Sequence, residues 1–302
     1  MFFTGKCFAF LFFLSTLFNP LRLEAGGLSF TVDPSKIRLI ISGGGSQAGT
    51  IKVSSQSNDK VKIKVYLEDW VYSKIQDGTK VFSPAKNTPL SCSDWVTFSP
   101  AEFTLMPFGE QNINYIMRVP ANAKGGYYSA MFFETALLNE EENALTFEVS
   151  GPGELRTGAI LNLRIGILFY VEAKDTIRRL AELTNLSVSN DLKNRQLVVT
   201  SDFKNTGNVD ITAGGSFHII DKQGMVLARS EFDKVYTFPG DTARLTASCK
   251  DTIPKGKYDL ILTVDLGKAL EELSMGRGPV VTQETEIEVS TGGEIIKVGE
   301  LK

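Results

Sequence analysis

The chain has 302 residues, a formal net charge of −3 at pH 7, 42% hydrophobic residues and 22% charged residues. This length predicts about two domains, and the composition favours buried cores over disorder. Lysine and arginine are scattered along the sequence and form no basic cluster. Composition and charge therefore argue against a nucleic-acid partner.

The N-terminal residues predict an export signal. Lys6 precedes an apolar run from Cys7 to Phe18, and Leu23-Glu24-Ala25 offers an approximate small-residue cleavage site. The apolar run is shorter than the about 20 residues that a membrane-spanning helix needs. We therefore expect residues 1–25 to be a cleaved signal peptide, and the mature chain to be periplasmic or secreted, with no membrane span.

From Leu28 onward, the residue pattern is typical of an all-β protein. Short segments rich in β-branched and aromatic residues alternate with turns such as "SGGGS", "PFGEQ" and "ANAKGG". This spacing predicts two immunoglobulin-like β-sandwich domains in tandem. The expected boundaries after the signal peptide are 26–172 for the first sandwich, 173–177 for a linker, 178–290 for the second sandwich and 291–302 for a polar tail.

A loose internal repeat supports two copies of one architecture. In each half, a strand ends at a proline, and a Lys-Gly turn and a strand led by tyrosine follow, as in "AKGGYYSAMFF" and "KGKYDLILTV". A tyrosine in this place can fix a corner of such a sandwich. We expect Tyr127 or Tyr128, and Tyr258, to have this structural role. Short helices are expected only around 175–182 and 267–273.

Residues for catalysis or metal binding are scarce. His218 is the only histidine, and no nucleophile motif, Cys-x-x-Cys pair or phosphate-binding glycine loop occurs. Asp202 and Asp210 flank "FKNTGNVD", but the ligand spacing of an EF-hand is absent, which favours a plain turn. We expect no enzyme activity, cofactor, metal or small-molecule substrate. Cys92 and Cys249 are one disulfide or two free thiols, and the sequence leaves both open.

The segment "ILNLRIGILFYVEAK", residues 160–174, stands out near the middle of the chain. Every second residue from Leu161 to Val171 is apolar, which is typical of a strand with one buried face. This strand closes the first domain. Its apolar face is covered either by the rest of the same sandwich or by another protein.

The first domain resembles the periplasmic pilus-assembly chaperones of the PapD-like kind. The segment "WVTFSPAEFTLMPFGEQNINYIMRVPANAKGGYYSAMFFET" resembles the middle of such a chaperone, and "LNLRIGILFYV" is similar to its closing strand. The segment "SKIRLIIS" resembles its first strand and places an arginine at Arg38. The resemblance covers about residues 28–171, and Ile167 stands where that family usually has a lysine.

This resemblance implies a chaperone-like function and a set of partner-binding residues. The closing strand would bind a secreted pilus or other envelope subunit by β-strand addition. Arg38 and Arg164 would hold the C-terminal carboxylate of that partner. The side chains donated to the partner would be those of Leu163, Ile165, Ile167 and Phe169.

Two other functions remain open from the sequence. The chain is faintly similar to the WxL-interacting proteins of Gram-positive surfaces, which implies a structural or adhesive envelope protein that binds wall polymer or another surface protein. A carbohydrate-binding module is a third reading, with Trp70 and Trp95 as aromatic platforms.

Overall fold

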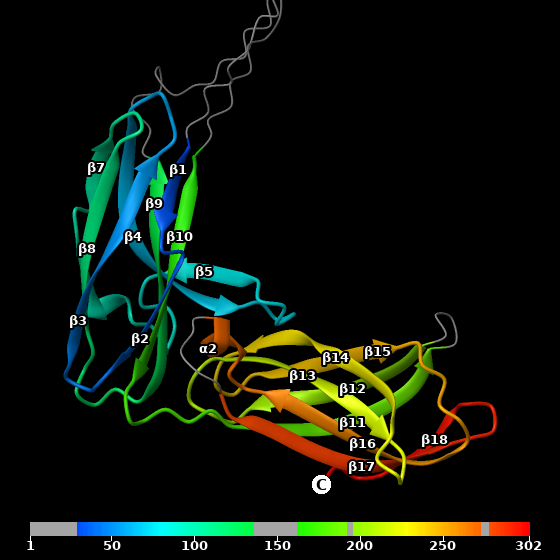
Figure 1. Cartoon of the computed structure of the whole chain (residues 1–302). Coiled ribbons are helices and arrows are strands. Elements are labelled where there is room, and N and C mark those ends of the chain that lie inside the picture. Colours follow the sequence, from blue (N-terminus) through cyan, green and yellow to red (C-terminus); the bar gives the residue numbers. More distant parts are fainter. Residues whose placement is uncertain (1–28, 136–161, 192–195, 273–277) are drawn as a thin grey trace, which may run out of the picture.

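The computed structural model describes residues 29–135, 162–191, 196–272 and 278–302 (Figure 1). Two β-sandwiches lie at an angle to each other and give the molecule the outline of an L. The expected all-β fold with two immunoglobulin-like domains is confirmed, because strands make up nearly all of the regular structure. The expected signal peptide lies outside the described residues.

The first sandwich has one sheet in the order β1-β3-β8-β6 and a second in the order β2-β10-β9-β4-β5, with β7 paired to β4. A 3-10 turn, Ser93–Trp95, precedes β6. The strands are β1 (Phe30–Asp33), β2 (Lys36–Ile41), β3 (Ser46–Ser55), β4 (Val61–Tyr72), β5 (Lys80–Pro84), β6 (Val96–Ser99), β7 (Glu102–Leu105), β8 (Glu110–Arg118), β9 (Gly125–Thr135) and β10 (Arg164–Ala173).

The second sandwich packs a sheet in the order β11-β12-β15 on a sheet in the order β14-β13-β16-β17-β18. A short helix, α2 (Lys268–Glu272), confirms the helix expected around 267–273. The strands are β11 (Ala181–Asp191), β12 (Gln196–Asn205), β13 (Ile211–Ile220), β14 (Val226–Thr237), β15 (Thr242–Cys249), β16 (Gly256–Asp265), β17 (Val280–Val289) and β18 (Ile295–Val298).

The first strand of the chain crosses from one sheet to the other at a proline. β1 pairs with β3 up to Asp33, and β2 then pairs in parallel with β10 from Lys36 onward. Pro34 lies between them and has no N–H to donate to a sheet. The change of sheet at this residue limits how much of β10 is covered.

Two boundary expectations are wrong. No helix forms at 175–182: β11 begins at Ala181, and the backbone before it bonds to the turn after β12, since Asn208 N donates to Arg178 O at 3.0 Å. The expected polar tail at 291–302 belongs to the second sandwich, because it contains β18 and Lys302 N donates to Glu284 O at 3.0 Å.

The expected tyrosine corner is present in the second sandwich. The Tyr258 hydroxyl donates to the carbonyl oxygen of Pro254 at 2.9 Å. Tyr128 of the first sandwich is fully buried, and its hydroxyl instead accepts a hydrogen bond of 2.5 Å from the backbone N–H of Asp210 in the second sandwich. Both tyrosines are therefore structural, but Tyr128 joins the domains.

Candidate functional site: the open edge of β10

The two edges of β10 are covered to different extents. Along one edge, β10 pairs antiparallel with β9 from Arg164 to Ala173. Along the other edge, it pairs with β2 only from Leu168 to Ala173. Residues 164–167 therefore have no strand partner on this side among the described residues, and we call them the open edge.

The hydrogen-bond alternation shows which backbone groups face the open edge. Thr135 N donates to Leu163 O at 3.0 Å, so the odd-numbered residues of β10 bond toward β9. Leu168 N donates to Ser35 O at 3.2 Å, so the even-numbered residues bond toward β2. The N–H and C=O groups of Arg164 and Gly166 consequently point to the side where no described strand lies.

The apolar stripe of β10 is covered mainly by the protein itself. Ile167 and Phe169 have no solvent-exposed surface and pack in the core of the first sandwich. Burying each such side chain contributes about 1.5–3 kcal/mol. This differs from the expectation that both enter a partner, and we assign them no such contact. Leu163, just before the open edge, and Ile165, within it, are only half-buried against the same core.

The opposite face of the open edge carries Arg164. Its guanidinium lies 3.4 Å from the centroid of the Phe132 ring and forms an ion pair of 2.5 Å with Glu68. Gly166 makes room for this arrangement, because a Cβ atom there would lie 2.6 Å from Phe132. Arg164 is thus at the open edge, but a carboxylate of this chain already neutralises it.

Arg38 occupies a different environment from the one the resemblance implies. Its side chain is 2% exposed and bonds to Glu172 and to Asp210, with Nη1–Oδ1 and Nη2–Oδ2 distances of 3.0 and 2.7 Å to Asp210. Arg179 also bonds to Glu172 at 2.5 Å. Burial by itself would lower the pKa of Arg38. The charges of Asp210 and Glu172 have the larger combined effect, so the pKa of Arg38 is raised above its usual value. Arg38 is therefore bound within the chain, where no partner reaches it in this arrangement.

An aromatic cluster joins the two sandwiches beside this charge network. The Phe238 ring of the second sandwich lies 4.3 Å from Tyr128 and 5.1 Å from Trp70, centroid to centroid. Trp70 is 1% exposed, so it is a core residue and not the expected platform for sugar. Trp95 is half-buried and packs 4.2 Å from Tyr127.

Sequence reasoning missed the second-domain half of this junction. The sequence predicts a plain turn at Asp210 and offers no role for Phe238. The one available signal was that an arginine on an otherwise apolar strand, as in "SKIRLIIS", needs a carboxylate when buried. The sequence does not show which carboxylate, because Arg38 and Asp210 are 172 positions apart.

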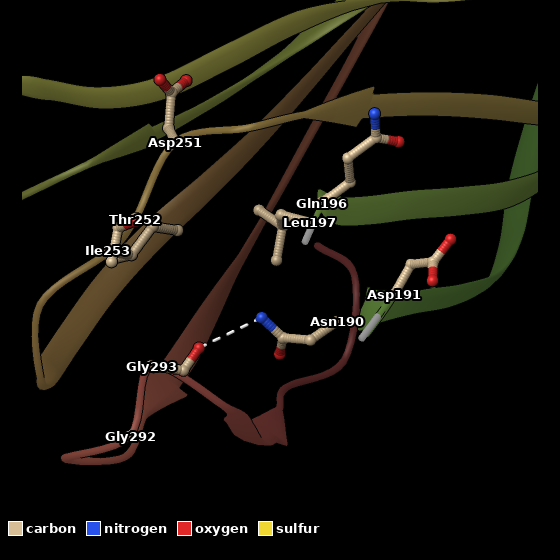
Figure 2. Close-up of a pocket in the computed structure, with 9 residues that line it drawn as sticks. All are labelled: Asn190, Asp191, Gln196, Leu197, Asp251, Thr252, Ile253, Gly292 and Gly293. Atoms are coloured by element: carbon tan, nitrogen blue, oxygen red, sulfur yellow. Dashed lines mark hydrogen bonds between the residues drawn. The ribbon is translucent and has the colours of Figure 1, made fainter. Parts of the chain in front are cut away.

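A hollow of about 300 Å³ lies on the second sandwich, away from β10 (Figure 2). Asn190 spans it and donates from Nδ2 to Gly293 O at 3.1 Å. The lining residues are Asn190, Asp191, Gln196, Leu197, Asp251, Thr252, Ile253, Gly292 and Gly293. Its side chains form no arrangement that points to a reaction.

Metal-binding clusters are not found in the described part of the chain. The two aspartates that flank "FKNTGNVD" form separate ion pairs, Asp202 with Arg244 and Asp210 with Arg38. Cys92 and Cys249 are both free thiols. Within the described ranges, no helix has the length and apolar character needed to cross a membrane.

These observations define a tandem immunoglobulin-like protein with a partly uncovered closing strand. Neither a protein-family model nor a curated protein matches the sequence. Solved structures to which the chain is similar include fimbrial chaperones, the class that the sequence resembles. The chaperone CfaA of class 5 fimbriae is 15% identical, with 84% of this chain and 98% of that chain covered and a TM-score of 0.44.

Two further chaperone structures have comparable similarity. The E. coli chaperone DraB is 12% identical, with 84% of this chain and 95% of that chain covered and a TM-score of 0.41. A chain of the CsuC–CsuE chaperone–tip subunit complex of Acinetobacter baumannii is 10% identical, with 84% and 97% covered and a TM-score of 0.40. Similarity of this degree concerns the fold, so the function is argued from the geometry of β10.

Proposed function

We propose that this chain is an exported, non-enzymatic, chaperone-like protein that binds an extended segment of another protein by β-strand addition at the open edge. The observation that carries the proposal is the half-covered edge of β10, where Arg164 and Gly166 present unpaired backbone groups. An uncovered strand edge is a template for another strand. Main-chain hydrogen bonds then supply affinity, and alternate side chains supply specificity.

The surroundings of the open edge suit this use. β10 is fixed along its other side by the full ladder with β9, so the edge is held in place before a partner arrives. Leu163 and Ile165 are half-buried there and offer apolar contact to the inward-facing side chains of an added strand. The partner segment should therefore alternate apolar residues with polar ones.

The partner class that we propose is a secreted pilus or other envelope subunit, which is what the resemblance of the sequence implies. The place of binding would be the periplasm or the cell exterior. CfaA is a fimbrial chaperone, and CsuC forms a pre-assembly complex with the tip subunit CsuE. A structural or adhesive envelope role is the competing function.

A matched pair of substitutions at one position tests strand addition. Arg164→Pro and Arg164→Ala both remove the guanidinium, but only proline removes the N–H that faces the open edge. Ile165→Pro serves as the positive control for damage, because the N–H of Ile165 bonds toward β9. Circular dichroism and thermal unfolding establish which variants keep the fold.

Each mature variant is then purified from its native cell, and the proteins that accompany it are identified by mass spectrometry. We expect one secreted subunit with the wild type and with Arg164→Ala, and its loss with a folded Arg164→Pro. Hydrogen exchange should show new protection at the amides of Arg164 and Gly166 in the complex. Equal capture by both position-164 variants, or capture of wall material alone, would reject strand addition and favour the structural role.

A further inference from the structure

Two lysines, from opposite edges of the β10 sheet, extend over the rings of Trp70 and Tyr170, which we call the aromatic layer. Lys36 begins β2 and Lys80 begins β5, which are the two outer strands in the order β2-β10-β9-β4-β5. The Nζ atom of Lys36 lies 5.6 Å from the centroid of Tyr170, and that of Lys80 lies 5.8 Å from the centroid of Trp70. The Trp70 and Tyr170 rings are themselves 5.3 Å apart, so both ammonium groups stand over the same layer.

The ammonium groups of Lys36 and Lys80 are not bonded directly to a carboxylate of the described residues. Neither forms an ion pair there, and the Nζ atom of Lys80 donates to the Gly78 carbonyl at 2.6 Å. Burial lowers the pKa of Lys80, the nearby charge of Lys36 lowers it further, and the charge of Asp77 only partly offsets this lowering. Two half-buried like charges disfavour each other. Arg38, the next outward-facing residue of β2, is bonded to two carboxylates, whereas Lys36 and Lys80 form no such ion pair among the described residues.

The position of Lys36 connects this site with the open edge. Lys36 pairs with Leu168, the first residue of β10 beyond the open edge, so a strand added to residues 164–167 ends against the start of β2. Ile37 and Leu39 point into the core, so Lys36 points to the outer face of the sheet. A side chain that rises from the added segment onto this face comes toward the ammonium group of Lys36, and that of Lys80 lies over the adjoining Trp70 ring. A chain-terminal carboxylate stays near the plane of the sheet.

We propose that Lys36 and Lys80 together bind the carboxylate of an acidic side chain, an Asp or Glu that the partner presents to the outer face of the sheet near the end of its added segment. This inference rests on the proposed function, since the partner is the one held at the open edge. The lysines supply charge-assisted hydrogen bonds, and the aromatic layer beneath them limits access of water. The site makes the protein selective for acidic partner segments.

The test uses synthetic ten-residue peptides that alternate valine with threonine and carry an N-terminal fluorophore. One set has an amidated C-terminus and a glutamate in place of one threonine, at each threonine position in turn. A second peptide has no glutamate and a free C-terminal carboxylate. A third has neither and is neutral. Fluorescence anisotropy gives the Kd of each peptide for the full mature chain.

The variant is the double substitution Lys36→Gln and Lys80→Gln. Its control is Lys64→Gln with Lys124→Gln, which removes the same charge at two exposed lysines outside this corner. We expect one glutamate position to tighten binding to the wild type by about tenfold over the neutral peptide. That gain should vanish in the Lys36/Lys80 variant and persist in the control.

The alternative outcomes separate the two proposals. Equal binding of the neutral and all the acidic peptides would overturn the lysine site and leave strand addition standing. Tighter binding only of the peptide with a free C-terminal carboxylate would overturn the proposal that the bound carboxylate belongs to a side chain. If none of the peptides binds the wild type, both proposals fail together.

Discussion

Arg38 of the first sandwich and Asp210 of the second face each other as a two-point ion pair. Nη1 and Nη2 lie 3.0 and 2.7 Å from the two carboxylate oxygens, and both side chains are 2% exposed or less. Paired planar groups of this kind fix direction as well as distance. Together with the contact between Phe238 and Trp70, this pair fixes the angle at which the two sandwiches meet.

Removing the carboxylate of Asp210 should therefore weaken the junction. Asp210→Ala leaves Arg38 buried with Glu172 alone, and breaking one partner of a buried pair typically costs about 3–5 kcal/mol. Denaturant unfolding followed by tryptophan emission checks this, because Trp70 lies in the junction. The matched control is Arg244→Ala, which breaks the exposed pair with Asp202 and should cost about 0–1 kcal/mol. Equal losses for the two variants would contradict a junction role.

Several tyrosines should resist ionisation. Burial raises the pKa of Tyr66 to about 12, with help from its hydrogen bond of 2.7 Å to Glu134. Burial also raises the pKa values of Tyr72, Tyr115, Tyr128 and Tyr170. In the unfolded chain, tyrosine has a pKa of about 10, so it loses its proton at a lower pH than these tyrosines do in the folded protein. Folding stability is then complete below pH about 10 and falls as the pH rises toward 12.

This alkaline loss of stability is measured by absorbance of the phenolate form together with circular dichroism. Part of the tyrosine absorbance should appear only as the fold is lost. Ionisation of all eight tyrosines near pH 10 with the fold intact would refute the burial argument.

Gly166 should be intolerant of a side chain. In Gly166→Ala, the new Cβ atom meets the buried ring of Phe132 at 2.6 Å, and overpacking of this kind costs about 1–3 kcal/mol. Gly214→Ala is the control, since its Cβ atom would make an ordinary contact of 3.5 Å with Lys268. Thermal unfolding compares the two variants. A Gly166→Ala protein as stable as the wild type would show that Phe132 has room to move.

The two thiols should differ in reactivity. Burial raises the pKa of the fully buried Cys92 to about 12, so almost none of it is thiolate at pH 8. Cys249 is half-buried, and its pKa is also raised by burial. Iodoacetamide at pH 8 should label Cys249 slowly and Cys92 only after unfolding, as read by peptide mass mapping. Failure to label either thiol in denaturant without reductant would instead indicate a disulfide.

The limits of sequence reasoning follow from the range of the interactions. The short helix around 267–273 and the corner at Tyr258 rest on neighbours in the chain, and both are confirmed. The expected helix at 175–182 is wrong, because the backbone there bonds to the turn around Asn208. The polar tail expected at 291–302 instead contains β18, which pairs with β17 and packs Ile295 and Val298 against the core of the second sandwich.

The sequence by itself determined the all-β class, the tandem sandwiches and the face of β10 that is buried. These features follow from a local pattern, the apolar residue at every second position of a strand. Only the tertiary structure decided which protein covers that face, how far β2 runs along β10, and whether Arg38 is available to a partner. Those answers depend on a change of sheet at Pro34 and on a carboxylate at Asp210. Each of these features brings together segments that are far apart in the sequence, and no local residue pattern predicts such a contact.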